Sequence, residues 1–187
     1  MGMLKYKLVL ILCIVFTSYS YAKDIDTIKK IRTEYQNIEA NISKYISIEE
    51  NVDDFCKKNI LVNETVHQQH NFMKTFYSNV ADIKKIILNC ENQEQKSVLS
   101  LYFNNNQLFF IYSLEKFSYG NDENRYYFDS QTMIKWINHQ TDMNQKYEMA
   151  NNHEKYLLSE EYHNIEQANL SYASYLKKKA FLSLEKK

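Results

Sequence analysis

The sequence predicts an α+β domain in which an antiparallel meander of about six strands is packed by an N-terminal and a C-terminal helix. Three hairpin-like segments follow one another within residues 72–138, and helical stripes flank them at 25–48 and 149–185. Strands joined by tight turns pair antiparallel, and helices then cover the apolar faces of such a sheet. We therefore expect residues 23–187 to form a single domain behind a leader at 1–22.

Composition supports a folded chain and excludes several classes of function. Of the 187 residues, 44% are hydrophobic and 14% aromatic, which is typical of a protein with a packed core. The formal net charge is zero, so the sequence lacks the basic surface that nucleic-acid binding requires. With two glycines and no proline, it also lacks the glycine loops that cradle phosphates.

The first 22 residues are typical of a signal peptide. Lys5 and Lys7 precede the apolar run Leu8–Phe16, and Ala22 supplies a small residue before the expected cleavage point. An apolar run of this length is too short for a permanent membrane helix, so we expect no stable membrane span after cleavage. The leader predicts export, either to a periplasm or into the medium.

The three cysteines have different expected roles. Cys13 lies in the leader and raises the alternative of a lipoprotein, which is disfavoured because Leu12 stands where a small residue is expected. Cys56 and Cys90 remain in the mature chain, and an even count in an oxidising compartment favours a disulfide between them. The alternative is a pair of buried free thiols.

Isoleucine and tyrosine recur at alternating spacings of three and four over residues 25–48. This spacing places them on one face of an amphipathic helix. We expect the helix to lie on the domain's own sheet, and a coiled-coil dimer seam is the alternative. The stripe consists of Ile28, Ile31, Tyr35, Ile38, Ile42 and Tyr45.

Three segments about 25 residues apart share one pattern of an aromatic pair, a polar turn and two large apolar residues. They are TFYSNVADIKKII (75–87), LYFNNNQLFFIY (101–112) and YYFDSQTMIKWI (126–137). The middle copy predicts a hairpin turn at Asn104–Asn106, because asparagine tolerates the left-handed backbone that such turns need. The regular spacing predicts an internal repeat of hairpins.

The middle hairpin is expected at the centre of the sheet. Pairing Phe103 with Leu108 makes both of its faces largely apolar, whereas Lys85 and Lys135 occupy the position of Phe110 in the outer copies. A meander in chain order would therefore cover the middle copy on both sides. In this register one face holds Leu99, Leu101, Phe103, Leu108, Phe110 and Tyr112.

The third hairpin offers a candidate binding surface. The same register places Arg125 opposite Trp136, which predicts a cation–π contact across the strands. Together with Tyr127 these residues would form a partly solvent-exposed aromatic surface at the edge of the sheet. Simple surface packing is the alternative.

Residues 149–185 read as a helix with a broad apolar stripe. Lysines gather at its end, where positive charge complements the helix dipole. Docking to a membrane surface or to a partner is the alternative role of this cluster. The lysines are Lys177, Lys178, Lys179, Lys186 and Lys187.

No catalytic, cofactor or metal site is evident in the sequence. His67 and His70 form the nearest approach to a metal motif, but no third ligand is placed beside them. His153 and His163 have no serine or cysteine partner at a recognisable spacing. We therefore expect a protein that is not an enzyme and carries no cofactor.

The leader, the helix, the aromatic hairpins and the final ENRYYF…MIKWI hairpin together resemble a loose group of small exported bacterial proteins of unknown function. Their hairpins are similar to MORN-type repeats, in which an aromatic pair, a turn and a hydrophobic residue follow one another. The resemblance covers roughly residues 25–140 and implies no catalytic residue.

Three functions follow from these observations, in descending order. The first is a non-catalytic interaction module with an aromatic sheet surface, whose partner is an unknown protein. The second is a carrier of a small apolar ligand held between sheet and helices. The third is an enzyme with dispersed residues such as His67, His70 and Glu123.

Overall fold

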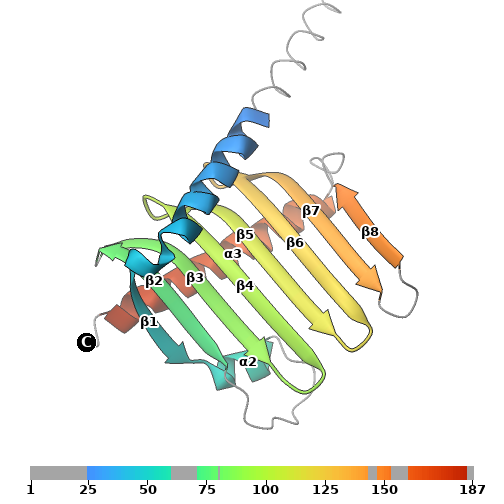
Figure 1. Cartoon of the computed structure of the whole chain (residues 1–187), viewed down its shortest axis with the longest axis horizontal. Coiled ribbons are helices and arrows are strands. Elements are labelled where there is room, and N and C mark those ends of the chain that lie inside the picture. Colours follow the sequence, from blue (N-terminus) through green and yellow to red (C-terminus); the bar gives the residue numbers. More distant parts are fainter. Residues whose placement is uncertain (1–24, 60–70, 80, 143–146, 153–159, 185–187) are drawn as a thin grey trace, which may run out of the picture.

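The computed structural model of the chain is a sheet with the N-terminal helix on one face and the long C-terminal helix on the other (Figure 1). It describes residues 25–59, 71–79, 81–142, 147–152 and 160–184. The predicted leader with Cys13, the pair His67 and His70, and the terminal lysines 186 and 187 lie outside these residues. No helix of the described residues is both long and apolar enough to cross a membrane.

The sheet is antiparallel and its strands lie side by side in chain order, which confirms the predicted α+β meander. Within the described ranges the sheet has eight strands rather than about six, because one strand is added at each edge of the predicted hairpins. The strands are β1 (Ile46–Asn51), β2 (Phe72–Asn79), β3 (Asp82–Glu91), β4 (Gln95–Asn104), β5 (Gln107–Phe117), β6 (Gly120–Asp129), β7 (Thr132–Asp142) and β8 (Tyr147–Asn152).

The N-terminal helix spans residues 25–40 and is shorter than the predicted 25–48. It is followed by the 3-10 turn η1 (Ile42–Lys44) and then by β1. Ile46 and Ile48 alternate with polar residues, so they suit a strand edge as well as a helix, and pairing with β2 decides between the two. The predicted stripe is confirmed in the helix itself, where Ile31 and Ile38 are buried.

The C-terminal helix α3 (Glu160–Leu184) begins later than the predicted residue 149, because the segment before it forms β8 and pairs with β7. Its apolar stripe crosses the sheet on the face opposite the N-terminal helix (Figure 1). Lys177 donates a 2.6 Å hydrogen bond to the backbone carbonyl of Asn106 and so ties α3 to the middle hairpin. The buried residues of the stripe are Tyr162, Ala173, Leu176 and Ala180.

The three predicted hairpin turns are present. Asn105 and Asn106 both have positive φ, at 49° and 60°, which confirms the asparagine turn of the middle copy. Ser130 and Gln131 have the same left-handed backbone in the third copy. The register that pairs Phe103 with Leu108 is also confirmed.

Each hairpin contains a β-bulge just after its turn, which the sequence interpretation missed. The extra residues are Lys84, Phe109 and Ile134, which are 25 residues apart. A bulge adds one residue to a strand, so each side chain beyond it lies on the opposite face of the sheet from the one that an unbroken strand would give it. The prediction that Phe110 shares a face with Phe103 is therefore wrong, because Phe110 lies opposite Tyr102 instead.

The bulges produce two cores, one on each face of the sheet, and the middle hairpin contributes to both as predicted. The larger core lies under α3 and contains the aliphatic residues that follow each turn, such as Leu108 and Ile111. The smaller core lies under the N-terminal helix. Its buried residues are Ile31, Ile38, Tyr102, Phe110 and Tyr127.

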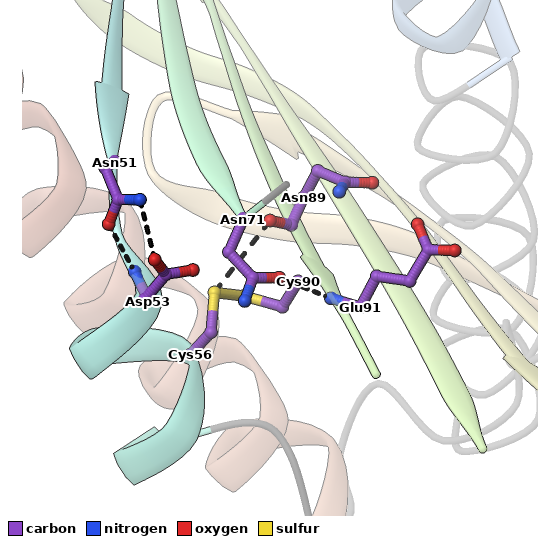
Figure 2. The surroundings of a disulfide bond; sticks show 7 residues. All are labelled: Asn51, Asp53, Cys56, Asn71, Asn89, Cys90 and Glu91. Atoms are coloured by element: carbon purple, nitrogen blue, oxygen red, sulfur yellow. Dashed lines mark hydrogen bonds between the residues drawn. A yellow bond between two sulfur atoms is a disulfide. The ribbon is translucent and has the colours of Figure 1, made fainter. Parts of the chain in front are cut away.

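A disulfide between Cys56 and Cys90 fastens the short helix α2 (Asp53–Asn59) to β3, with the two Cα atoms 5.5 Å apart (Figure 2). The predicted pairing is confirmed. Asn51 stabilises the start of α2, because its side chain accepts a 3.0 Å hydrogen bond from the backbone N–H of Asp53. The disulfide is consistent with an oxidising compartment outside the cytoplasm.

Candidate functional site

The three residues predicted to form a binding surface do not share a face. Arg125 pairs with Ile137, and Trp136 pairs with Tyr126, because the bulge at Ile134 shifts β7 by one residue relative to β6. The predicted cation–π contact between Arg125 and Trp136 is therefore wrong. Arg125 and Tyr127 lie on the side of the N-terminal helix, whereas Trp136 packs against the core under α3.

The side chain of Trp136 is held in place by ring stacking and a hydrogen bond. Its ring stacks on that of Tyr126, with centroids 5.9 Å apart, and its Nε1 donates a 2.8 Å hydrogen bond to Oδ1 of Asn124. Asn138 also donates to that oxygen, at 2.9 Å, and to Oδ1 of Asp122. The indole thus marks the border between the apolar core and a buried polar network.

Arg125 and Tyr127 belong to a groove of about 580 Å³ between the N-terminal helix and the sheet, which we call the helix–sheet groove. Its volume lies within the range of small-molecule sites. The helix supplies one wall and strands β3 to β6 supply the floor. Its aromatic lining consists of Tyr35, Tyr102, Phe110, Tyr112 and Tyr127.

The aromatic rings of the groove contact one another at steep angles. Tyr35, on the helix, meets two rings edge to face, at 5.1 Å from the ring of Tyr102 and 5.3 Å from that of Phe110. Phe110 in turn lies 5.1 Å from Tyr127 on the next strand, with the two rings tilted. Such contacts fix the orientation of rings, so this wall is preorganised.

Three cationic side chains also line the groove: Arg32 from the helix, Lys85 from β3 and Arg125 from β6. The guanidinium carbon of Arg32 lies 5.8 Å from the centroid of the Tyr127 ring. Arg125 pairs with Glu123, and Lys85 pairs with a carboxylate of the helix. The described residues that line the groove include no acidic side chain.

Two tyrosine hydroxyls of the groove, those of Tyr102 and Tyr112, stay protonated at neutral pH. Burial raises the pKa of Tyr102 far above its ordinary value, and the nearby carboxylate of Glu39 raises it further. The pKa of Tyr112 is also raised, first by burial and then by Glu123. These phenols are therefore neutral hydrogen-bonding groups rather than general bases.

A second recess, of about 530 Å³, lies on the opposite face between α3 and strands β4 to β6. Its lining is mostly uncharged, with Ser97, Ser113 and Asn169 among the polar groups. Glu115 is the carboxyl group of the recess, and its pKa is raised by burial and by the neighbouring Asp122. The recess thus combines one carboxyl group with uncharged hydrogen-bonding groups and differs from the cationic groove.

The structure brings no metal site together: within the described ranges no three His, Cys, Asp or Glu side chains are close enough to hold an ion. Glu123, named above for a dispersed enzyme site, pairs with Arg125.

No family model, curated protein or solved structure matches this chain. The resemblance to MORN-type hairpins stays a prediction. What the structure adds is a repeat defined by the bulge as well as by the turn.

Sequence reasoning found two residues of the groove, Arg125 and Tyr127, and missed the rest. The sequence did hold a sign of the bulges. In the second strand of each hairpin the two core residues are three positions apart, as in Leu108 and Ile111. An unbroken strand would place core residues two apart, so a spacing of three indicates a bulge. With that correction, Tyr102, Phe110 and Tyr127 fall on one face.

Proposed function

We propose that the protein is an exported, non-catalytic interaction module that binds a small molecule in the helix–sheet groove. The observation that carries the proposal is the preorganised aromatic wall formed by Tyr35, Tyr102, Phe110 and Tyr127 beside a recess of about 580 Å³. Tyr102, Phe110 and Tyr127 are buried and hold the wall in place, so the ring surface open to a ligand is that of the half-buried Tyr35 and Tyr112. Rings held in this way lose little side-chain freedom on binding. The predicted leader and the disulfide support a site outside the cytoplasm.

A protein partner has less support. Five large hydrophobic side chains of the described residues are exposed, and only Tyr175 and Leu182, both on α3, share an element. The others are Ile25 on the N-terminal helix, Ile46 on β1 and Tyr119 at the turn between β5 and β6. Protein-binding surfaces are contiguous apolar patches, and scattered single residues do not form one. The groove is therefore the better candidate for recognition.

A carrier of a wholly apolar ligand is the second candidate, and the five aromatic rings favour it. Three cationic side chains border the same space, and covering them with a ligand that forms no hydrogen bond would cost desolvation energy. The groove therefore suits a ligand with a polar group better than a pure hydrocarbon.

The proposal is tested by screening a library of small organic fragments against the oxidised protein by two-dimensional NMR. Binding in the groove is expected to shift resonances of Tyr35, Tyr112 and Tyr127 together. The variant Tyr112→Ala should weaken these hits, whereas Tyr119→Ala, at an exposed turn, should leave them unchanged. Hits that cluster elsewhere, or that survive in Tyr112→Ala, would contradict the proposal.

A further inference from the structure

The helix–sheet groove carries a small excess of positive charge. Arg32, Lys85 and Arg125 come from the N-terminal helix, β3 and β6, so the fold gathers them from distant parts of the chain. Two of these cations are paired with carboxylates that do not line the groove, Lys85 with Glu39 and Arg125 with Glu123. The five side chains together carry one net positive charge, which favours an anion over a cation in the groove.

The three cations differ in how far they are already engaged. Lys85 is buried, and its ammonium is held by Glu39 at 2.6 Å and by the Tyr102 ring at 4.9 Å. Arg32 is exposed and, in the described structure, contacts the ring face of Tyr127. Contact with a ring face is not a hydrogen bond to an oxygen, so it does not occupy the guanidinium group's five N–H donors as a carboxylate would.

Arg125 supplies a second guanidinium group from the floor of the groove. Its side chain is 47% exposed, and its ion pair with Glu123 involves the nitrogen Nη2. A guanidinium group has three nitrogens in a plane, so one ion pair leaves further donors for a ligand. Two arginines, one on the helix wall and one on the sheet floor of the groove, suit a planar anion.

We infer that the groove binds a small organic anion that combines a ring-sized apolar body with a carboxylate. The carboxylate is bound by Arg32 and Arg125, and the body packs against the rings of Tyr35 and Tyr112. This assignment rests on the proposed function and adds the chemical class of its ligand. Guanidinium donors match both oxygens of a carboxylate, whereas a neutral amide offers them a single acceptor.

The test compares 2-naphthoate with 2-naphthamide, which have the same bicyclic body and differ in charge. We expect 2-naphthoate to bind the oxidised protein about tenfold more tightly in calorimetry at pH 7 and low salt. The preference should shrink as salt is added, because the arginines are exposed. A third compound, 2-naphthyl phosphate, separates a carboxylate site from a general oxyanion site: binding tighter than that of the carboxylate would overturn the assignment.

Arg32→Gln is the informative variant, because it removes one exposed charge from the wall of the groove. Lys116→Gln is its matched control, with the same change in net charge on an exposed strand residue outside the groove. The naphthoate preference should fall severalfold in Arg32→Gln and persist in Lys116→Gln. Equal losses in both variants would show that overall charge, not the groove, is responsible.

The remaining outcomes separate the two proposals. Equal binding of 2-naphthoate and 2-naphthamide in the groove would overturn the anion assignment and leave the proposed function standing. Binding of neither compound at about 5 mM, with no tyrosine resonance of the groove shifted, would contradict both.

Discussion

Lys85 on β3 and Glu39 on the N-terminal helix form an ion pair, with 2.6 Å between Nζ and Oε1. The Lys85 side chain is 8% exposed, so its charge is removed from water and balanced by the helix. Its ammonium also lies 4.9 Å from the centroid of the Tyr102 ring. The residue directly after the bulge is Phe110 in the middle hairpin and Lys85 in the first. These contacts explain how a charged lysine can occupy that buried position.

Removing Glu39 should destabilise the protein more than removing the lysine. In Glu39→Gln the buried ammonium of Lys85 loses its counter-charge, and we expect a loss of about 1–2 kcal/mol in the free energy of unfolding. Lys85→Met replaces the charge by an apolar group of similar length, so its effect should be smaller. Urea unfolding measures both, and Glu34→Gln on the same helix is the control. Equal effects of Glu39→Gln and Glu34→Gln would contradict the role of the pair.

Two neighbouring turn residues should respond differently to glycine. Asn106 accepts a 3.1 Å hydrogen bond from the N–H of Ile83 and donates a 2.7 Å bond to the carbonyl of Ala81, so it joins the first two hairpins. Asn106→Gly relieves the positive φ but loses both bonds, and we expect a net loss of about 1 kcal/mol. Asn105→Gly relieves the same backbone conformation without that loss and should be neutral or slightly stabilising. Thermal unfolding of both variants decides the point; matching stabilities would show that the bonds contribute nothing.

Loss of the disulfide should be the most damaging of these changes. The Cys56–Cys90 bond spans 34 positions of the sequence, and a loop of this length stabilises a fold by about 3–4 kcal/mol in the chain-entropy model. The double variant Cys56→Ala, Cys90→Ala should lose this amount in denaturant unfolding, and reductant should no longer affect it. Alkylation of the native, unreduced protein provides the check. Two freely modified thiols would mean that the bond does not form.

Stability should fall as Glu115 ionises. Burial, and then Asp122, raise the pKa of this carboxyl group above its ordinary value of 4.5, so the folded state holds its proton more tightly than the unfolded state. The contribution is complete below pH 4.5 and is lost as the pH rises through the raised pKa. Glu115→Gln should therefore raise the melting temperature by about 1–2 °C at neutral pH and leave it unchanged in acid. A difference that is the same at every pH would contradict this assignment.

Local patterns predicted the hairpins because turn chemistry is local. The residues at 105 and 106 tolerate a left-handed backbone, and the apolar pairs on each side of such a turn favour strands. The bulges were missed because an extra residue changes which face a side chain occupies without changing its composition. Arg125 and Trp136 were placed together for this reason, and the residue at 134 separates them.

The sequence by itself determined the class of fold, the three turns, the central place of the middle hairpin and the pairing partners of the disulfide. These depend on local backbone preferences, on apolar patterning and on a count of two cysteines beyond the predicted leader. Only the tertiary structure decided that residues 46–51 join the sheet and which rings face the N-terminal helix. Both outcomes depend on strand pairing between distant segments, where a single extra residue moves a side chain from one core to the other.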